Sequence, residues 1–429
     1  MRFITFIILL CLGIAESLAQ NSADEEFEDT QDSIRLNPDI VFGSGEDYIH
    51  VPSFIRKKTN HIRLNGADWS RLSEKLKPSS DNPLVIVHIG DSHIQAEIGT
   101  NVTREMLQLR FGNAGRGLVA PLRLAGTNQP RDYRFESTGH WTAEKIMRAP
   151  WSHPMGFNGT SISLNGTESD ITLSTSREED DDEYNPFTRI TLFHSGEMKI
   201  TSIIDNATGM PVVFNASSPD EGQTDIALWT PVENATVSFT TSSPFTLFAA
   251  LISGERPGVM YHAIGNNGAT YSTYNRIGST ARGVAALNPD LIVLSLGTNE
   301  AFGSLDLSGF TRNVDTLVKD LQSNNPDALI LIVTPMECHR RIVRRSRRRR
   351  AASYSVNTNI LPIRNALLRY ASDNGIAVYD WYDIAGGSGA SDVWIEAGLF
   401  GKDHVHHTAT GYRLHGRLFY EALEELLTD

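Results

Sequence analysis

The chain has 429 residues but only two cysteines, Cys11 and Cys338. Because Cys11 lies in a segment that we expect to be removed, no intrachain disulfide can hold the mature chain together, and a hydrophobic core must stabilise it. Basic residues are also in deficit: 38 lysines and arginines stand against 51 aspartates and glutamates, a net charge of -13. A surface of that charge repels phosphate backbones, which disfavours nucleic-acid binding as the main function.

Long apolar runs are scarce, and none after the N-terminal segment reaches the ~20 residues that a membrane span needs. The first run, Phe3 to Ile14, follows a basic start and precedes a small-x-small site at Ser17-Leu18-Ala19. This order predicts a signal peptide over residues 1–19 and an exported protein, periplasmic or secreted. A buried N-terminal strand is one alternative. A lipoprotein anchored through Cys11 is another, although Ile-Leu-Leu precedes that cysteine instead of small residues.

The rest of the chain divides into four segments by its pattern. Residues 20–55 are polar and acidic without periodicity, which predicts a disordered lead-in. In 56–119 and 256–429, buried-type apolar runs alternate with helical patterns, which predicts an α/β domain with a parallel sheet between helices. Short β-branched runs without helices fill 120–255 and predict an inserted all-β sandwich. The expected strands of the α/β domain are 84–89, 291–296, 329–333 and 376–380, and the expected helices are 94–109, 310–321, 360–372 and 409–427.

Two candidate functional segments follow predicted strands directly, where open α/β sheets place their sites. In Gly90-Asp91-Ser92-His93, a serine stands at a tight strand-to-helix turn, where it is either a nucleophile or a helix cap. In Gly297-Thr298-Asn299-Glu300, the asparagine amide is able to donate to an oxyanion, although asparagine is also common in turns.

The third candidate segment, Asp403-His404-Val405-His406, precedes the last predicted helix. An aspartate three residues before a histidine lets one turn join carboxylate and imidazole and fix the tautomer of the ring. A metal site is the alternative for this histidine-rich segment. No HExxH motif and no cysteine pair is present to support it, and we expect neither a metal nor another cofactor.

In this order, the three segments resemble the motifs of the SGNH/GDSL hydrolase superfamily. The resemblance implies a three-layer, flavodoxin-like α/β domain in which Ser92 is the nucleophile, His406 the general base and Asp403 the residue that orients His406. It also implies an oxyanion hole made of the Ser92 and Gly268 N–H groups and the Asn299 amide, with Gly265 as the alternative to Gly268. The first motif reads GDSH instead of GDSL, and Glu300 replaces the commoner aspartate.

The inserted β-rich segment and the text RFGNAGRGLVAP are similar to exported bacterial peptidoglycan O-acetylesterases, which carry a carbohydrate-binding-like sandwich there. The resemblance implies a serine esterase that removes O-acetyl groups from an extracellular carbohydrate, with peptidoglycan or another acetylated polysaccharide as partner. We expect the insertion to bind polymer and to take no part in the chemistry. The alternatives are a lipase or thioesterase of the same superfamily and a non-catalytic glycan-binding protein.

Two further features have more than one interpretation. Arg340 to Arg350 is rich in arginine and is either a solvated loop or protease-sensitive site, or a docking site for an anionic polymer. Trp381, Tyr382 and Trp394 lie near the last motif and are either a sugar-stacking platform or part of the core.

Overall fold

The computed structural model describes residues 51–428, except 78–79, 81, 176–184, 243, 255 and 344–351. The predicted signal peptide, most of the lead-in and most of the arginine-rich segment lie outside these residues. Residues 51–55 are described, however, and Ile55 is buried in the main hydrophobic core. The folded chain therefore begins before residue 56, where we had expected the lead-in to end.

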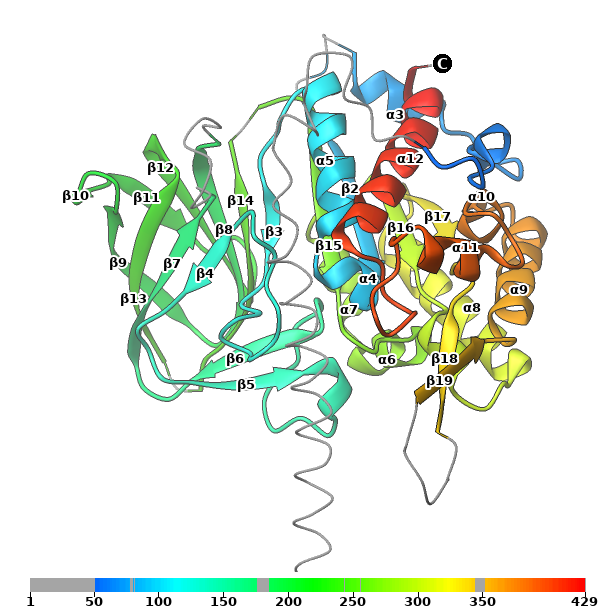
Figure 1. Ribbon diagram of the computed structural model, residues 1–429. Coiled ribbons are helices and arrows are strands. Elements are labelled where there is room, and N and C mark those ends of the chain that lie inside the picture. The colour runs from blue at the N-terminus through cyan, green and yellow to red at the C-terminus, as the bar shows by residue number, and fades with distance from the viewer. Residues whose placement is uncertain are drawn as a thin grey trace, which may run out of the picture.

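A six-stranded sheet forms the centre of the α/β part (Figure 1). Its order is β1-β20-β17-β16-β2-β15, and all neighbours are parallel except β1 and β20. Counted from the first parallel strand, this is the flavodoxin-like order 2-1-3-4-5, with its switch point between β2 and β16. The strands are β1 (Ile62–Arg63), β2 (Leu84–Gly90), β15 (Val259–Gly265), β16 (Leu291–Ser295), β17 (Leu329–Val333) and β20 (Ala377–Tyr379).

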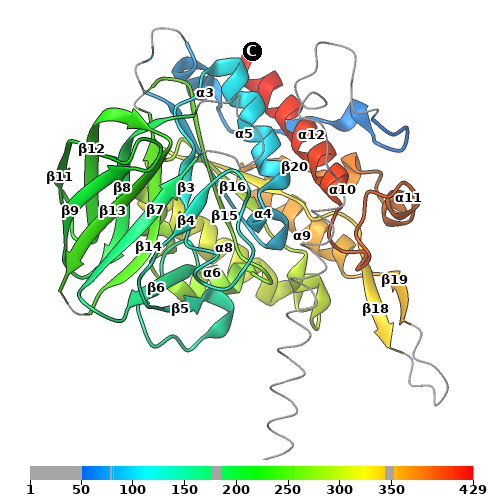
Figure 2. The same ribbon diagram turned by 60° about the vertical axis from the view of Figure 1, so that its left-hand side comes forward.

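Helices cover the sheet in two groups. α5 packs against α12, whereas α8 contacts α6, α7 and α9, and the sheet lies between these groups (Figures 1 and 2). Every residue of β2 is buried, as expected of a strand covered on both faces. The predicted three-layer α/β fold is confirmed. The helices are α3 (Ser70–Lys75), α4 (Ser92–Gln95), α5 (Ile98–Phe111), α6 (Tyr271–Ile277), α7 (Thr280–Ala285), α8 (Leu307–Asn324), α9 (Ile360–Asp373), α10 (Trp381–Ile384), α11 (Ala390–Glu396) and α12 (Ala409–Thr428), with short 3-10 helices η1 (Lys57–Thr59), η2 (Ile146–Arg148) and η3 (Asn299–Phe302).

The helix predicted over 94–109 is wrong in one respect, because the chain forms two helices there. α4 ends at Gln95, and Glu97 takes a left-handed conformation (φ +53°) before α5 begins at Ile98. Apolar spacing is the same on both sides of this break, so the helical period alone gave no sign of it.

Two antiparallel sheets lie beside the α/β part (Figure 1). Side chains of both sheets share one hydrophobic core, for example Phe135 and Phe239 of the first and Ile190 and Leu247 of the second. The division into domains at 120 and 255 stays a prediction. The first sheet has the order β10 (Met210–Pro211), β9 (Met198–Asp205), β13 (Asn234–Thr241), β7 (Glu168–Ser174), β4 (Arg134–Glu136); the second has β11 (Phe214–Ser217), β12 (Gln223–Val232), β8 (Phe187–Ser195), β14 (Thr246–Ser253), β6 (Thr160–Leu164), β5 (Trp141–Lys145), with β3 (Gly117–Val119) also paired to β14.

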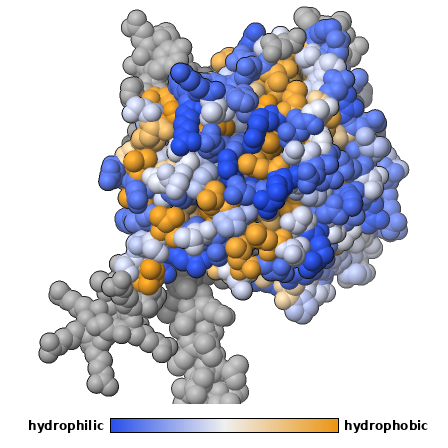
Figure 3. Space-filling view, turned by 90° about the vertical axis from the view of Figure 1, so that its right-hand side faces the viewer, coloured by the Kyte–Doolittle hydropathy of each residue, from blue (hydrophilic) through white to orange (hydrophobic). Residues whose placement is uncertain are grey.

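The first residues of the arginine-rich segment are not in a loop. Arg340 belongs to β18 (His339–Val343), which pairs with β19 (Ala352–Val356) in a hairpin. Its guanidinium donates to Ala301 O and Asn357 Oδ1, so this arginine is held by the fold. Figure 3 shows the right-hand side of the molecule as drawn in Figure 1, and on this face apolar residues are interspersed with hydrophilic ones. Within the described ranges, the helices are too short or too polar to cross a membrane.

A buried network of four charges connects α5 with the residues that precede β3 and β4. Glu97 Oε2 accepts from Arg104 at 3.0 Å and from Arg116 at 2.7 Å, and Asp132 pairs with both arginines. The Arg116 side chain is 1% exposed and also donates to Leu118 O. Loss of one cation would leave two carboxylates in the interior with a single counter-charge.

We therefore expect Arg116→Met to lower the free energy of unfolding by about 3–5 kcal/mol, because it leaves an uncompensated buried charge. Arg123→Met is the matched control. The Arg123 side chain is 74% exposed and lies 3.9 Å from Glu136, so its loss should cost less than about 1 kcal/mol. Urea titrations of both variants provide the comparison, and equal losses would show that the buried network adds no stability.

Candidate active site

Ser92 is separated from the end of β2 only by Asp91 and is the first residue of α4. The turn is tight because α4 packs straight onto the strand ends. A Cβ at Gly90 would lie 2.2 Å from Ile94 Cγ1, and a Cβ at Gly265 would lie 2.1 Å from Gln95 N. Glycine at both positions lets α4 start at the sheet edge, where the Ser92 hydroxyl is presented.

Asp403 and His406 lie in the turn before α12. His406 Nε2 is 2.8 Å from Ser92 Oγ, and His406 Nδ1 is 2.5 Å from Asp403 Oδ2. The second Asp403 oxygen accepts the N–H groups of Val405 and His406. Because a carboxylate only accepts, the proton belongs on Nδ1, and Nε2 is left to accept from Ser92. The structure thus joins three predicted residues in one hydrogen-bonded chain, which is able to move a proton from Ser92 to His406.

Charges around His406 adjust its basicity. Burial lowers the pKa of His406, but the hydrogen bond and charge of Asp403, together with the charge of Asp91, outweigh burial and raise it above the ordinary value of 6.5. Burial raises the pKa of Asp403, whereas the hydrogen bond and charge of His406 bring it down to about 2. Asp403 is therefore ionised at neutral pH and holds the imidazole in the tautomer that accepts from Ser92.

The neighbouring histidines point elsewhere. His404 has a left-handed backbone (φ +59°), and its ring contacts the Tyr354 ring in a tilted arrangement at 4.2 Å between centroids. Its Nδ1 lies 3.4 Å from His339 Nδ1. His407 is buried and packs against Trp394 at 5.0 Å. Among the residues that the structure describes, no group of three histidine, cysteine or acidic side chains is arranged to hold a metal ion.

The predicted oxyanion donors lie around the same turn. Asn299 begins η3 after β16, and its amide donates to Ala269 O at 3.0 Å and to Asp91 Oδ2 at 3.2 Å. Gly268 has φ +79°, and within the described chain its N–H has no hydrogen-bond partner. Gly265 belongs to β15 and packs under α4, so its lack of a side chain is explained by that contact. Gly268 therefore has an N–H that is free to donate, as its predicted role requires.

Two acidic residues for which we predicted no role support the site. Asp91 is 1% exposed, and it accepts the His93 N–H and the Asn299 amide. Burial raises the pKa of Asp91 to about 6. Glu300 accepts the Tyr271 N–H at the start of α6, and burial raises its pKa to about 7. Both carboxyl groups stand in motifs already noted, but only the fold shows which donors they hold.

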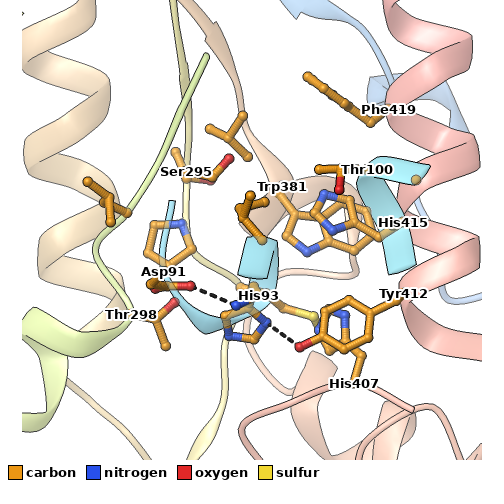
Figure 4. A pocket seen from close by; sticks show the side chains of 18 of the residues that line it. Asp91, His93, Thr100, Ser295, Thr298, Trp381, His407, Tyr412, His415 and Phe419 are labelled. Atoms are coloured by element: carbon orange, nitrogen blue, oxygen red, sulfur yellow. Dashed lines mark hydrogen bonds between the residues drawn. The ribbon is translucent and has the colours of Figure 1, made fainter. Parts of the chain in front are cut away.

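A cavity of about 60 Å³ lies next to the candidate site, and His93 is among the residues that line it (Figure 4). The described residues that line it include Asp91, His93 and Tyr412 but not Ser92 or His406. The His93 ring contacts the His406 ring at 5.2 Å between centroids, and the Tyr412 hydroxyl lies 3.0 Å from His93 Nδ1. Burial lowers the pKa of His93 to about 3, so the ring beside the catalytic candidates is neutral.

The sugar-stacking interpretation of the three aromatic residues is wrong. Trp381, Tyr382 and Trp394 are 2%, 5% and 0% exposed and belong to the main hydrophobic core. Trp381 stacks on His415 at 4.0 Å with an interplanar angle of 8°. Core packing, the other interpretation, is therefore the correct one.

A model of the GDSL-like Lipase/Acylhydrolase family matches residues 235–414. This range contains Asn299, Asp403 and His406, whereas Ser92 precedes it. No curated protein matches the sequence closely enough to show a relationship. The family match and the flavodoxin-like strand order together confirm the resemblance to the SGNH/GDSL hydrolases, and they support an acylhydrolase.

Solved structures give a more particular likeness. The structure of a peptidoglycan O-acetylesterase is 23% identical, with a TM-score of 0.69, and the match covers 86% of this chain and 99% of that chain. An acetyl xylan esterase is 18% identical, with a TM-score of 0.30 and coverage of 39% and 81%. A lipase/acylhydrolase from Enterococcus faecalis is 20% identical, with a TM-score of 0.28 and coverage of 40% and 77%. The first of these shows a shared fold.

The raised pKa of His406 gives a pH prediction. A base that accepts the Ser92 proton must be neutral, so kcat/KM on an aryl acetate should fall as the pH drops, with a midpoint above 6.5. Asp403→Asn removes the negative charge that helps to raise this pKa, so the midpoint should move to lower pH. The rate at neutral pH should also fall, by about 10⁴-fold.

His404→Ala is the control for this pH experiment, because His404 faces the β18–β19 hairpin. It should leave the midpoint where it is. A midpoint that stays in place in Asp403→Asn would mean that a group other than His406 controls the acid side of the profile.

Proposed function

We propose that this protein is an exported serine esterase that removes O-acetyl groups from an extracellular carbohydrate. Peptidoglycan is the substrate that we favour. The observation that carries the proposal is the hydrogen-bonded chain from Ser92 through His406 to Asp403. A helix-capping serine needs only backbone partners. The Ser92 hydroxyl instead faces an imidazole whose other nitrogen is held by a carboxylate, as a nucleophile requires.

The reaction takes place in two steps. Ser92 Oγ attacks the acetyl carbonyl while His406 Nε2 takes its proton, and the Ser92 N–H, the Gly268 N–H and the Asn299 amide stabilise the oxyanion. His406 then returns the proton to the leaving sugar hydroxyl, which leaves an acetyl group on Ser92. Water attacks this acetyl-enzyme with His406 again as base, and acetate and free Ser92 result. The Asn299 amide exchanges its longer bond, to Asp91, for the oxyanion.

We infer that Ser92 attacks a short acyl group and not a fatty acyl chain. A lipase needs an apolar groove that runs from the nucleophile. The cavity in Figure 4 is largely apolar, but its described lining includes neither Ser92 nor His406. The likeness to a peptidoglycan O-acetylesterase supports acetyl esters over the lipase or thioesterase alternative.

The substrate class is inferred from the structural likeness. The match with the peptidoglycan O-acetylesterase covers 86% of this chain, so it includes antiparallel strands as well as the α/β part. We infer that residues 120–255 form an inserted sandwich domain that binds polymer beside the site. Residues 1–19 would direct the chain across the cytoplasmic membrane to an acetylated cell-wall polymer.

Replacement of the nucleophile is the direct mutational test. Ser92→Ala should leave the fold intact, since α4 needs no serine hydroxyl, and should lower turnover of an aryl acetate on the order of a millionfold. His406→Ala should be comparably damaging, whereas His404→Ala should retain most of the activity. A purified Ser92→Ala protein with a tenth of wild-type activity would show that another residue is the nucleophile.

Comparison of substrates tests the acyl group and the polymer separately. We expect acetate release from O-acetylated peptidoglycan to exceed release from acetyl-xylan, and aryl acetate to be cleaved faster than aryl octanoate. Acetate and aryl alcohol are measured at equal enzyme concentration. Faster cleavage of the octanoate would favour a lipase, and equal rates on both polymers would remove the preference for peptidoglycan.

A further inference from the structure

The turn of residues 266–268, which follows β15 and contains Gly268, touches the predicted insertion at each of its three residues. The Asn266 amide donates to Asn158 O at 2.9 Å. The Asn267 amide donates to Asn128 Oδ1 at 3.0 Å. A Cβ on Gly268 would lie 3.4 Å from Met147 Cε, so Met147 covers the open side of this glycine. The insertion therefore supplies the outer wall of the turn.

Gln95 ties the same turn to the nucleophile. It lies three residues after Ser92 in α4 and is 3% exposed. Its Oε1 accepts the Asn267 N–H at 2.7 Å, and its Nε2 donates to Asn128 Oδ1 at 2.6 Å and to Thr127 Oγ1 at 2.8 Å. One amide side chain thus connects the helix of the nucleophile, the turn of residues 266–268 and a loop of the insertion.

The central atom of this network is Asn128 Oδ1, which accepts from both Gln95 and Asn267. Gln95 Oε1 accepts the Asn267 N–H and Asn128 Oδ1 accepts from the Asn267 side chain, so the residue directly before Gly268 is held through both its backbone and its side chain. A carbonyl or amide displaced by even 1 Å can cost catalysis about 100-fold.

We propose that Asn128 is a positioning residue for the oxyanion turn: through Gln95 and Asn267, the inserted segment holds the Gly268 N–H toward the carbonyl that Ser92 attacks. This inference rests on the proposed function and deepens it. It also changes our expectation that the insertion binds polymer and takes no part in the chemistry, because hydrolysis of a small ester then depends on a residue of the insertion.

The test measures kcat and KM for an aryl acetate, a substrate too small to need polymer binding. Asn128→Leu keeps the approximate size of the side chain and removes the acceptor. It should lower kcat by about 10- to 100-fold with KM within threefold, since the lost contribution belongs to the transition state. Gln95→Leu should have the same effect on kcat and KM. The double variant should be no slower than the slower single variant, because both changes break one network.

Asn206→Leu is the matched control. Asn206 is also an asparagine of the predicted insertion with an amide hydrogen bond, to Asn234 Oδ1 at 2.7 Å, but it is exposed at the β9–β10 turn. It should keep wild-type kcat and KM. Circular dichroism and melting curves establish that each variant is folded, and Asn128→Ser repeats the test if the leucine variant fails to fold.

Folded Asn128 variants with kcat within twofold of wild type would overturn the inference. Losses in Asn128→Leu and Gln95→Leu that multiply in the double variant would also overturn it. Ser92→Ala, assayed in parallel, separates this failure from failure of the proposed function. An inactive Ser92→Ala with a fully active Asn128→Leu contradicts only the role of Asn128, whereas an active Ser92→Ala contradicts the esterase mechanism itself.

Discussion

The hydrogen bond between Ser92 Oγ and His406 Nε2 connects residues 314 positions apart in the chain, and the rest of the fold fixes its two ends. The flavodoxin-like strand order places the ends of β2 and β16 side by side, so Ser92 and Asn299 emerge at the switch point of one sheet. Glycine at 90 and at 265 allows α4 to begin at that edge. The other end of the bond is fixed because Asp403 holds His406 through both the ring and the backbone.

Burial controls the charge in this region. Burial keeps the His93 ring neutral where it contacts the His406 ring. Asp403 stays ionised despite its burial, because it receives three hydrogen bonds from its own turn. Asp91 is a second buried carboxyl whose charge raises the pKa of His406 and whose oxygens hold neighbouring donors. The proposed reaction develops negative charge on an oxyanion and positive charge on an imidazole. Groups fixed in this way stabilise such charges because they need little reorganisation.

Local patterns were sufficient to predict much of this arrangement. Strands such as 84–89 and 329–333 are continuous apolar runs. Polar motifs at the ends of such strands locate the candidate site without knowledge of the loops between them. Contacts between distant segments were not predictable in this way. The Gln95–Asn128 hydrogen bond joins α4 to an inserted loop, and the break at Glu97 accompanies a buried ion network that forms only in the fold. The core position of Trp381 likewise depends on its stacking with His415, which lies in a different helix.

The central claim is that hydrolysis passes through an acetyl group on Ser92. Mass spectrometry of the enzyme, acid-quenched during turnover of an aryl acetate and digested to peptides, tests this claim most directly. The account predicts one added acetyl group on the peptide that contains Ser92, and none when Ser92→Ala is treated alike. An acetyl group on another residue, or steady hydrolysis with no acetylated peptide in a quench fast enough to trap the intermediate, would contradict it.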